Sequence, residues 1–104
     1  MTSLTDHDRR QLWRMAERLE LFSKGELALR VLIADIEFLL GALDAVDENV
    51  RQQLRGHWAI LEEVYSVALT MHAGRLNAQS ESLIQNAVMA LRTRVAELGR
   101  APEE

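Results

Sequence analysis

Apolar side chains recur at every third or fourth position through most of this chain, and that spacing constrains the fold more than any other feature. A period of 3.6 residues places such positions on one side of an α-helix, whereas a half-buried β-strand needs strict alternation. The chain has 104 residues, 48% of them hydrophobic, and a net charge of −4. These values predict one folded all-α domain and exclude a disordered chain.

Capping residues divide the periodic sequence into four predicted helices, over residues 6–22, 26–43, 48–73 and 81–98. Thr5, Asp47 and Ser80 carry side chains that favour helix N-caps, and Ser23 with Glu26 has the spacing of a capping box. Short connections favour antiparallel neighbours. The expected architecture is therefore a single-domain antiparallel four-helix bundle that spans residues 1–104.

The second predicted helix is unusually apolar. Thirteen of the 17 residues from Leu27 to Leu43 are apolar, which is more than one stripe along a helix. A helix that is apolar nearly all round is either enclosed by its own fold or covered by a partner. Both interpretations stay open: a deeply buried helix, or the interface of a homodimeric structural or regulatory bundle.

Asp35 interrupts this apolar segment. Helical spacing projects it among Leu32 and Phe38, away from the polar side of the helix. A carboxylate in such surroundings requires a hydrogen-bonded or charged partner, because its burial is otherwise unfavourable. Four residues of the third predicted helix are candidates for that partner: Arg51, Arg55, His57 and Trp58.

The sequence contains no pattern of residues that indicates an enzyme or a metal site. It has no cysteine nucleophile, no glycine-rich phosphate loop and no His-Glu-x-x-His pair. His57 and His72 are 15 residues apart, about 22 Å along one helix, so they cannot bind one metal together. We expect His72 to pack in the core, and we expect neither catalysis nor a cofactor.

Nucleic acid and membrane are also disfavoured as partners. Basic residues of the first predicted helix alternate with acidic ones, so no uniform basic stripe forms. The most apolar segment is interrupted by charges and is shorter than the roughly 20 residues of a membrane span. Charged residues occupy the N-terminal segment where a signal peptide needs an apolar stretch, which predicts a cytoplasmic protein.

Negative charge concentrates in the middle of the chain. Between residues 26 and 63 there are eight acidic and three basic residues, a net charge of −5. The side chains that we expect to form an acidic binding face are Asp44, Asp47, Glu48, Glu62 and Glu63. Complementary charge speeds association and sets specificity, so this face would suit a partner protein with a basic surface. The alternative is an ordinary solvated surface in which some acids only cap helices.

The run LIADIEFLLGALDAVDENVRQQLRGHWAILEEVYSVAL, residues 32–69, together with the preceding Gly25-Glu26, resembles a group of small all-helical bacterial immunity proteins. The pattern is apolar-Asp-apolar-Glu on one helix, Val-Asp-Glu at the turn and Trp-x-x-Leu-Glu-Glu-Val-Tyr on the next. The group includes the immunity proteins of contact-dependent inhibition and of colicin D-like systems. The resemblance implies stoichiometric inhibition of a cognate toxin, a nuclease with a basic cleft, by the acidic face defined above. Trp58 and Tyr65 belong to this pattern, but helical spacing places them on the inward face of the third predicted helix, so we expect them in the core.

Overall fold

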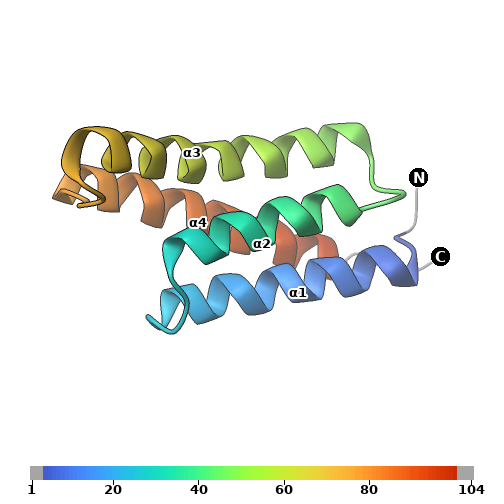
Figure 1. Cartoon of the computed structure of the whole chain (residues 1–104). Helices are drawn as coiled ribbons and strands as arrows, with labels where there is room; N and C mark the ends of the chain where they lie inside the picture. The colour runs from blue at the N-terminus through green and yellow to red at the C-terminus, as the bar shows by residue number, and fades with distance from the viewer. Residues whose placement is uncertain (1–3, 101–104) are drawn as a thin grey trace.

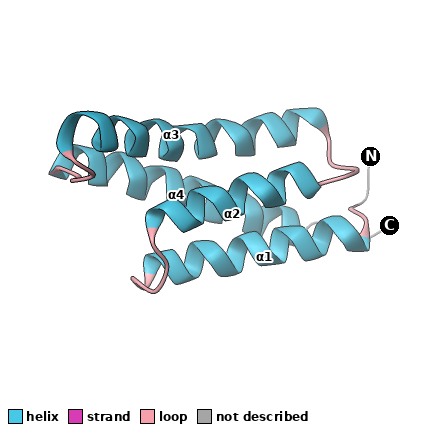
Figure 2. Cartoon of the chain, in the orientation of Figure 1, coloured by secondary structure: helices cyan, strands magenta, loops and turns pink. Residues whose placement is uncertain are grey.

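Helical periodicity and N-capping produce the expected architecture. The computed structural model, which describes residues 4–100, is an all-α four-helix bundle. Its helices are α1 (Asp6–Ser23), α2 (Leu29–Ala42), α3 (Glu48–His72) and α4 (Ala78–Gly99). Each helix runs antiparallel to the one before it (Figure 1), and residues 4–100 contain no strand (Figure 2). The predicted all-α antiparallel bundle is confirmed.

The N-caps of the helices agree with the sequence in two places and differ in a third. The side chains of Thr5 and Asp47 each accept a backbone N–H of the following first turn, as predicted. The sequence predicts Ser80 as the N-cap of α4, but the N-cap is Asn77, whose side chain accepts the Ser80 N–H at 2.8 Å. The helix therefore begins at Ala78, three residues earlier than predicted, because Asn77 is as favourable an N-cap as serine and precedes Ser80 in the chain.

The predicted capping box between α1 and α2 is wrong. Ser23 is the last residue of α1, and α2 begins only at Leu29. Gly25 adopts a left-handed conformation with φ of +77°, and the Glu26 N–H bonds back to the Leu21 carbonyl oxygen at 2.9 Å. This is the six-to-one bond that closes a helix at its C-terminus. The Ser-x-x-Glu spacing therefore ends one helix rather than starting the next.

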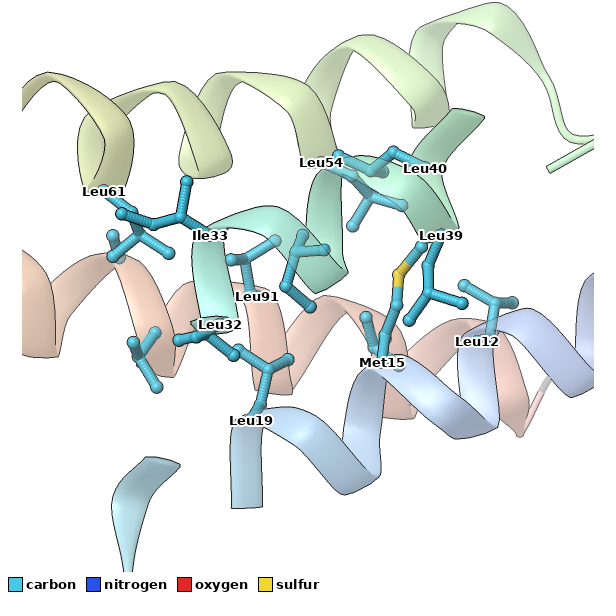
Figure 3. Packing of buried hydrophobic residues seen from close by; sticks show 14 of the residues in the cluster. Leu12, Met15, Leu19, Leu32, Ile33, Leu39, Leu40, Leu54, Leu61 and Leu91 are labelled. Carbon is cyan, nitrogen blue, oxygen red and sulfur yellow. The ribbon is translucent and has the colours of Figure 1, made fainter. Parts of the chain in front are cut away.

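The core is a single apolar cluster to which all four helices contribute one face (Figure 3). Its completely enclosed side chains include Leu12, Met15, Leu19, Leu32, Ile36, Leu40, Leu54, Leu61 and Leu91. Helix α1 packs against α2 and α4, and α3 packs against the same two helices. Burial of each such side chain contributes about 1.5–3 kcal/mol to folding, so the cluster accounts for most of the driving force.

The two ends of the bundle differ because the helices differ in length. Helices α3 and α4 have 25 and 22 residues, whereas α1 and α2 have 18 and 14. Figure 1 shows α3 and α4 projecting beyond the other two helices at the end where they join each other. We call residues 64–84 the hairpin end. The opposite end, which holds residues 42–51 and the start of α1, is called the turn end.

Candidate functional site

The connection between α2 and α3 is held by a buried carboxylate from α1. Asp8 is completely buried. Its two carboxylate oxygens accept the backbone N–H groups of Asp44 and Ala45 at 2.7 and 2.8 Å. Asp8 lies in the first turn of α1, where the helix dipole favours negative charge. Two charge-assisted hydrogen bonds and this dipole compensate the carboxylate for the loss of water.

Two further side chains bind the carbonyl groups at the C-terminus of α2. The His7 Nε2–H donates to the Ala42 carbonyl oxygen at 2.7 Å. One guanidinium nitrogen of Arg51 donates to the carbonyl oxygens of Leu40 and Leu43, at 3.2 and 3.1 Å. The last carbonyls of a helix lack partners within it. Side chains from α1 and α3 supply those partners here, so both neighbouring helices fix the position of the turn.

Three of the predicted binding residues lie together at this turn. Asp44, Asp47 and Glu48 are all exposed. The carboxylate of Asp47 caps α3 by accepting the Asn49 N–H at 2.8 Å, and Glu48 lies 3.6 Å from the Arg51 Nε. Asp44 is anchored through its backbone N–H, and its side chain is exposed to solvent. The turn thus presents three acidic side chains on a backbone that is fixed from beneath.

The other two predicted binding residues lie elsewhere. Glu62 and Glu63 are exposed in the middle of α3, and Glu62 accepts a hydrogen bond from the Ser66 hydroxyl at 3.1 Å. Fourteen residues separate Glu62 from Glu48, which is about 21 Å along the helix. Arg51 and Arg55 occur between them in the sequence. The structure therefore separates the five residues into a turn group and a mid-helix pair.

The predicted partner of Asp35 is wrong. Its carboxylate pairs with the Arg18 Nε of α1 at 3.4 Å, and both side chains are partly exposed. This ion pair places Asp35 on the side of α2 that faces α1, whereas all four predicted partners belong to α3. Trp58, one of the predicted partners, instead donates its indole N–H to the Ile33 carbonyl oxygen at 2.9 Å.

His72 is exposed, which corrects its predicted place in the core. It is the last residue of α3, in the part of the helix that extends past α2, so nothing covers that side. Trp58 and Tyr65 are half-buried and pack against the core. Within residues 4–100, no three acidic or histidine side chains gather in a way that could hold a metal ion. Across the same residues, no helix has the length and hydropathy needed to cross a membrane.

Most of the large apolar side chains of α2 pack inside the bundle. Leu32, one of the positions that a dimer interface on this helix would need, is completely buried. Phe38 is the large apolar side chain left outside, and it is 74% exposed. It lines a shallow hollow with Arg14 and Arg18 of α1. A homodimer through α2 remains a prediction, and it would depend on Phe38.

Sequence reasoning missed Asp8, the residue that organises the turn end. The signal was present: Asp8 precedes Leu12, Met15 and Leu19 at helical spacing, so the apolar stripe of α1 extends back onto a carboxylate. An acid on a buried stripe must receive hydrogen bonds.

We found no match to this chain among protein-family models, curated proteins or solved structures.

Proposed function

We propose that this protein is a non-enzymatic binding module that docks a basic protein surface through its turn end. The observation that carries the proposal is the anchored acidic turn. Asp44, Asp47 and Glu48 extend into solvent from a backbone held by Asp8. A loop that is fixed before binding loses little conformational entropy when a partner engages it, so more of the contact energy appears as affinity.

The resemblance to small helical immunity proteins makes the proposal more specific. The proposed partner is a cognate toxin, a nuclease whose cleft is basic because it must bind a polyanion. Three exposed carboxylates on one turn would occupy such a cleft in place of phosphate groups. The protein would act in the cytoplasm, with one copy inhibiting one toxin. Glu62 and Glu63 would contribute only where the partner extends about 21 Å along α3.

The test compares two variants that remove charge and keep the fold. Asp44→Asn, Asp47→Ser and Glu48→Gln together remove three negative charges, and serine at position 47 preserves a helix N-cap. The matched control is Glu62→Gln with Glu63→Gln on the same helix. Tagged full-length chains are used to capture partners from a native lysate at low salt, followed by elution along a salt gradient.

The wild-type chain and the control pair should retain one basic protein in near-stoichiometric amount, released as salt screens the charges over about 8–10 Å. The triple variant should lose most of it, because truncation of central, desolvated charge pairs costs about 2–5 kcal/mol. Equal retention by the triple variant would exclude the turn end as the site. Recovery of no protein besides the chain itself would contradict the proposal.

A further inference from the structure

The outward side of α2 carries a strip of apolar and small residues that the bundle does not enclose. Val31, Ala34, Phe38 and Gly41 follow one another at intervals of three, four and three residues, so they lie within a sector of about 80° on the helix. Ile36, which is completely buried, projects to the opposite side. Phe38 is 74% exposed, and a Cβ added at Gly41 would meet nothing within 4 Å. We call these four residues the α2 strip.

Three arginines of α1 border the α2 strip on one side. Arg10, Arg14 and Arg18 are spaced four residues apart, so they form one row along the helix, which we call the arginine row. The ion pair between the Arg18 Nε and Asp35 holds this row against α2. Because the two helices are antiparallel, Arg14 lies level with Phe38, about one turn from that ion pair. Arg14, Arg18 and Phe38 line the same hollow, of about 290 Å³.

The arginine row is more basic than the order of charges along α1 predicts. The structure directs the acidic residues of this helix elsewhere: Asp8 is buried at the turn end, and Glu17 and Glu20 line the groove between α1 and α4. Among residues 4–100, neither Arg10 nor Arg14 forms an ion pair. Like charges four residues apart on a helix repel each other, so carboxylates from another molecule would stabilise the row.

The other charges near the α2 strip do not offset the arginine row. On the flank toward α1, the three arginines and Asp35 have a net charge of +2. On the opposite flank, Arg30 and Glu37 cancel each other. Asp6 and Asp44 lie beyond the end of the strip, toward the turn end. The strip is therefore an apolar surface with a basic border, on a protein whose net charge is −4.

We propose that the α2 strip and the arginine row bind an acidic amphipathic helix of a partner protein. Apolar side chains of that helix would cover Phe38 and fill the hollow beside it, and carboxylates along its edge would pair with Arg10 and Arg14.

The charge of the border selects this partner over two others. A basic helix would meet charge of its own sign at the arginine row, and the repulsion would oppose binding. A second copy of this chain, packed antiparallel on the same strip, would bring the two arginine rows together with the same result. The inference does not rest on the proposed function, because it uses a different surface and a partner of opposite charge.

Fluorescence anisotropy of a labelled synthetic peptide, titrated with the full chain, tests this surface. The probe has about 18 residues, enough to form a helix, with leucine along one face and glutamate and alanine elsewhere. It should bind the wild-type chain with a Kd below about 100 µM, and binding should weaken as salt is raised. A second peptide of the same composition, in an order that gives no apolar face, should bind at least about tenfold more weakly.

Two variants separate the apolar and the charged parts of the surface. Phe38→Ser should weaken binding of the first peptide at least about tenfold, because it removes the apolar anchor. Arg10→Gln with Arg14→Gln should weaken it about threefold or more and reduce its salt dependence, because charge pairs at a rim contribute less. Circular dichroism checks that each variant keeps its helical content, which is expected because the three side chains are exposed.

Matched variants in the groove between α1 and α4 serve as controls. Trp13→Ser removes an aromatic side chain that is 65% exposed, and Arg92→Gln with Arg100→Gln removes the same charge from that groove. Both controls should bind the peptide like the wild-type chain, and an equal loss in them would overturn the proposal.

Three further outcomes would also overturn it. One is the absence of peptide binding to the wild-type chain at about 100 µM. Another is displacement of the peptide by single-stranded DNA at a lower concentration than by unlabelled peptide, which would assign the arginine row to phosphate. The third is a wild-type dimer, detected by sedimentation equilibrium, that Phe38→Ser dissociates, because a second copy would then cover the strip.

Discussion

The two ends of this bundle stabilise the connection between consecutive helices in different ways. At the turn end, the chain between α2 and α3 is bound by Asp8, His7 and Arg51 through hydrogen bonds to its backbone. At the hairpin end, α3 stops through local geometry, with Ala73 and Gly74 at φ of 53° and 83°. The first end depends on tertiary contacts, whereas the second depends on the chain itself.

This difference separates the surfaces that each end can offer. The turn end has its backbone satisfied from beneath, so acidic side chains can extend outward from a fixed frame. The hairpin end is uncovered on the side where α1 and α2 stop, and it exposes apolar side chains in place of charges. One end therefore suits a partner of opposite charge, and the other suits an apolar contact.

The largest expected effect comes from removing the anchor. Asp8→Ala leaves the N–H groups of Asp44 and Ala45 without acceptors in a partly buried position. Unpaired buried groups cost about 1–3 kcal/mol each, so we expect unfolding free energy to fall by about 2–4 kcal/mol. Urea denaturation followed by circular dichroism measures it. Asp6→Ala, two residues earlier in the same first turn of α1 and exposed, should change stability by less than about 0.5 kcal/mol. Similar losses in both variants would refute the anchoring role.

A smaller effect on stability is expected at Arg51 of the turn end, for which Arg75 of the hairpin end is the comparison. Arg51→Gln removes two hydrogen bonds to carbonyl groups of α2 and should lower the unfolding free energy by about 1 kcal/mol. Arg75→Gln at the hairpin end should leave it unchanged within about 0.5 kcal/mol, because the Arg75 side chain has no bonded partner among residues 4–100. Thermal denaturation of both variants makes the comparison. An Arg75 effect equal to that of Arg51 would contradict the account of the hairpin end as locally stabilised.

The smallest effects on stability are expected from substitution of two glycines, one within α3 and one just after its C-terminus. Gly56 lies within the helix, and an added Cβ there would meet nothing within 4 Å. Gly56→Ala should therefore stabilise the protein by about 0.5–1 kcal/mol through helix propensity. Gly74 has a positive φ, so Gly74→Ala should destabilise by a similar amount. Chemical denaturation of the two variants should give shifts of opposite sign, and shifts of the same sign would show that the hairpin turn does not need this conformation.

Local sequence patterns are sufficient to predict the helices and two of their N-caps. The roles of other residues depend on tertiary contacts, which local patterns do not contain. Thr5 and Asp47 cap helices by reaching backbone groups two or three residues away, so the sequence contains the whole interaction. Asp8 bonds to residues 36 and 37 positions away. Its role becomes visible only when α1 lies beside the end of α2.

Structural context also explains why two predictions from the sequence are wrong. Ser23 and Glu26 satisfy the spacing of a capping box, but the left-handed Gly25 between them ends α1 first. His72 continues the buried periodicity of α3, but α2 does not extend far enough toward the hairpin end to cover it. Helix length relative to its neighbours, which periodicity cannot supply, decides which of these residues meet solvent.

Amide hydrogen exchange of the full chain, followed residue by residue by NMR, tests the central claim most directly. That claim is that Asp8 holds the acidic turn in place before any partner arrives. Amides in connecting segments normally exchange through small local openings. We predict that the Asp44 and Ala45 amides are protected about as strongly as core helical amides, and that this protection disappears in Asp8→Ala. Exchange at Asp44 and Ala45 as fast as at exposed loop amides would contradict it.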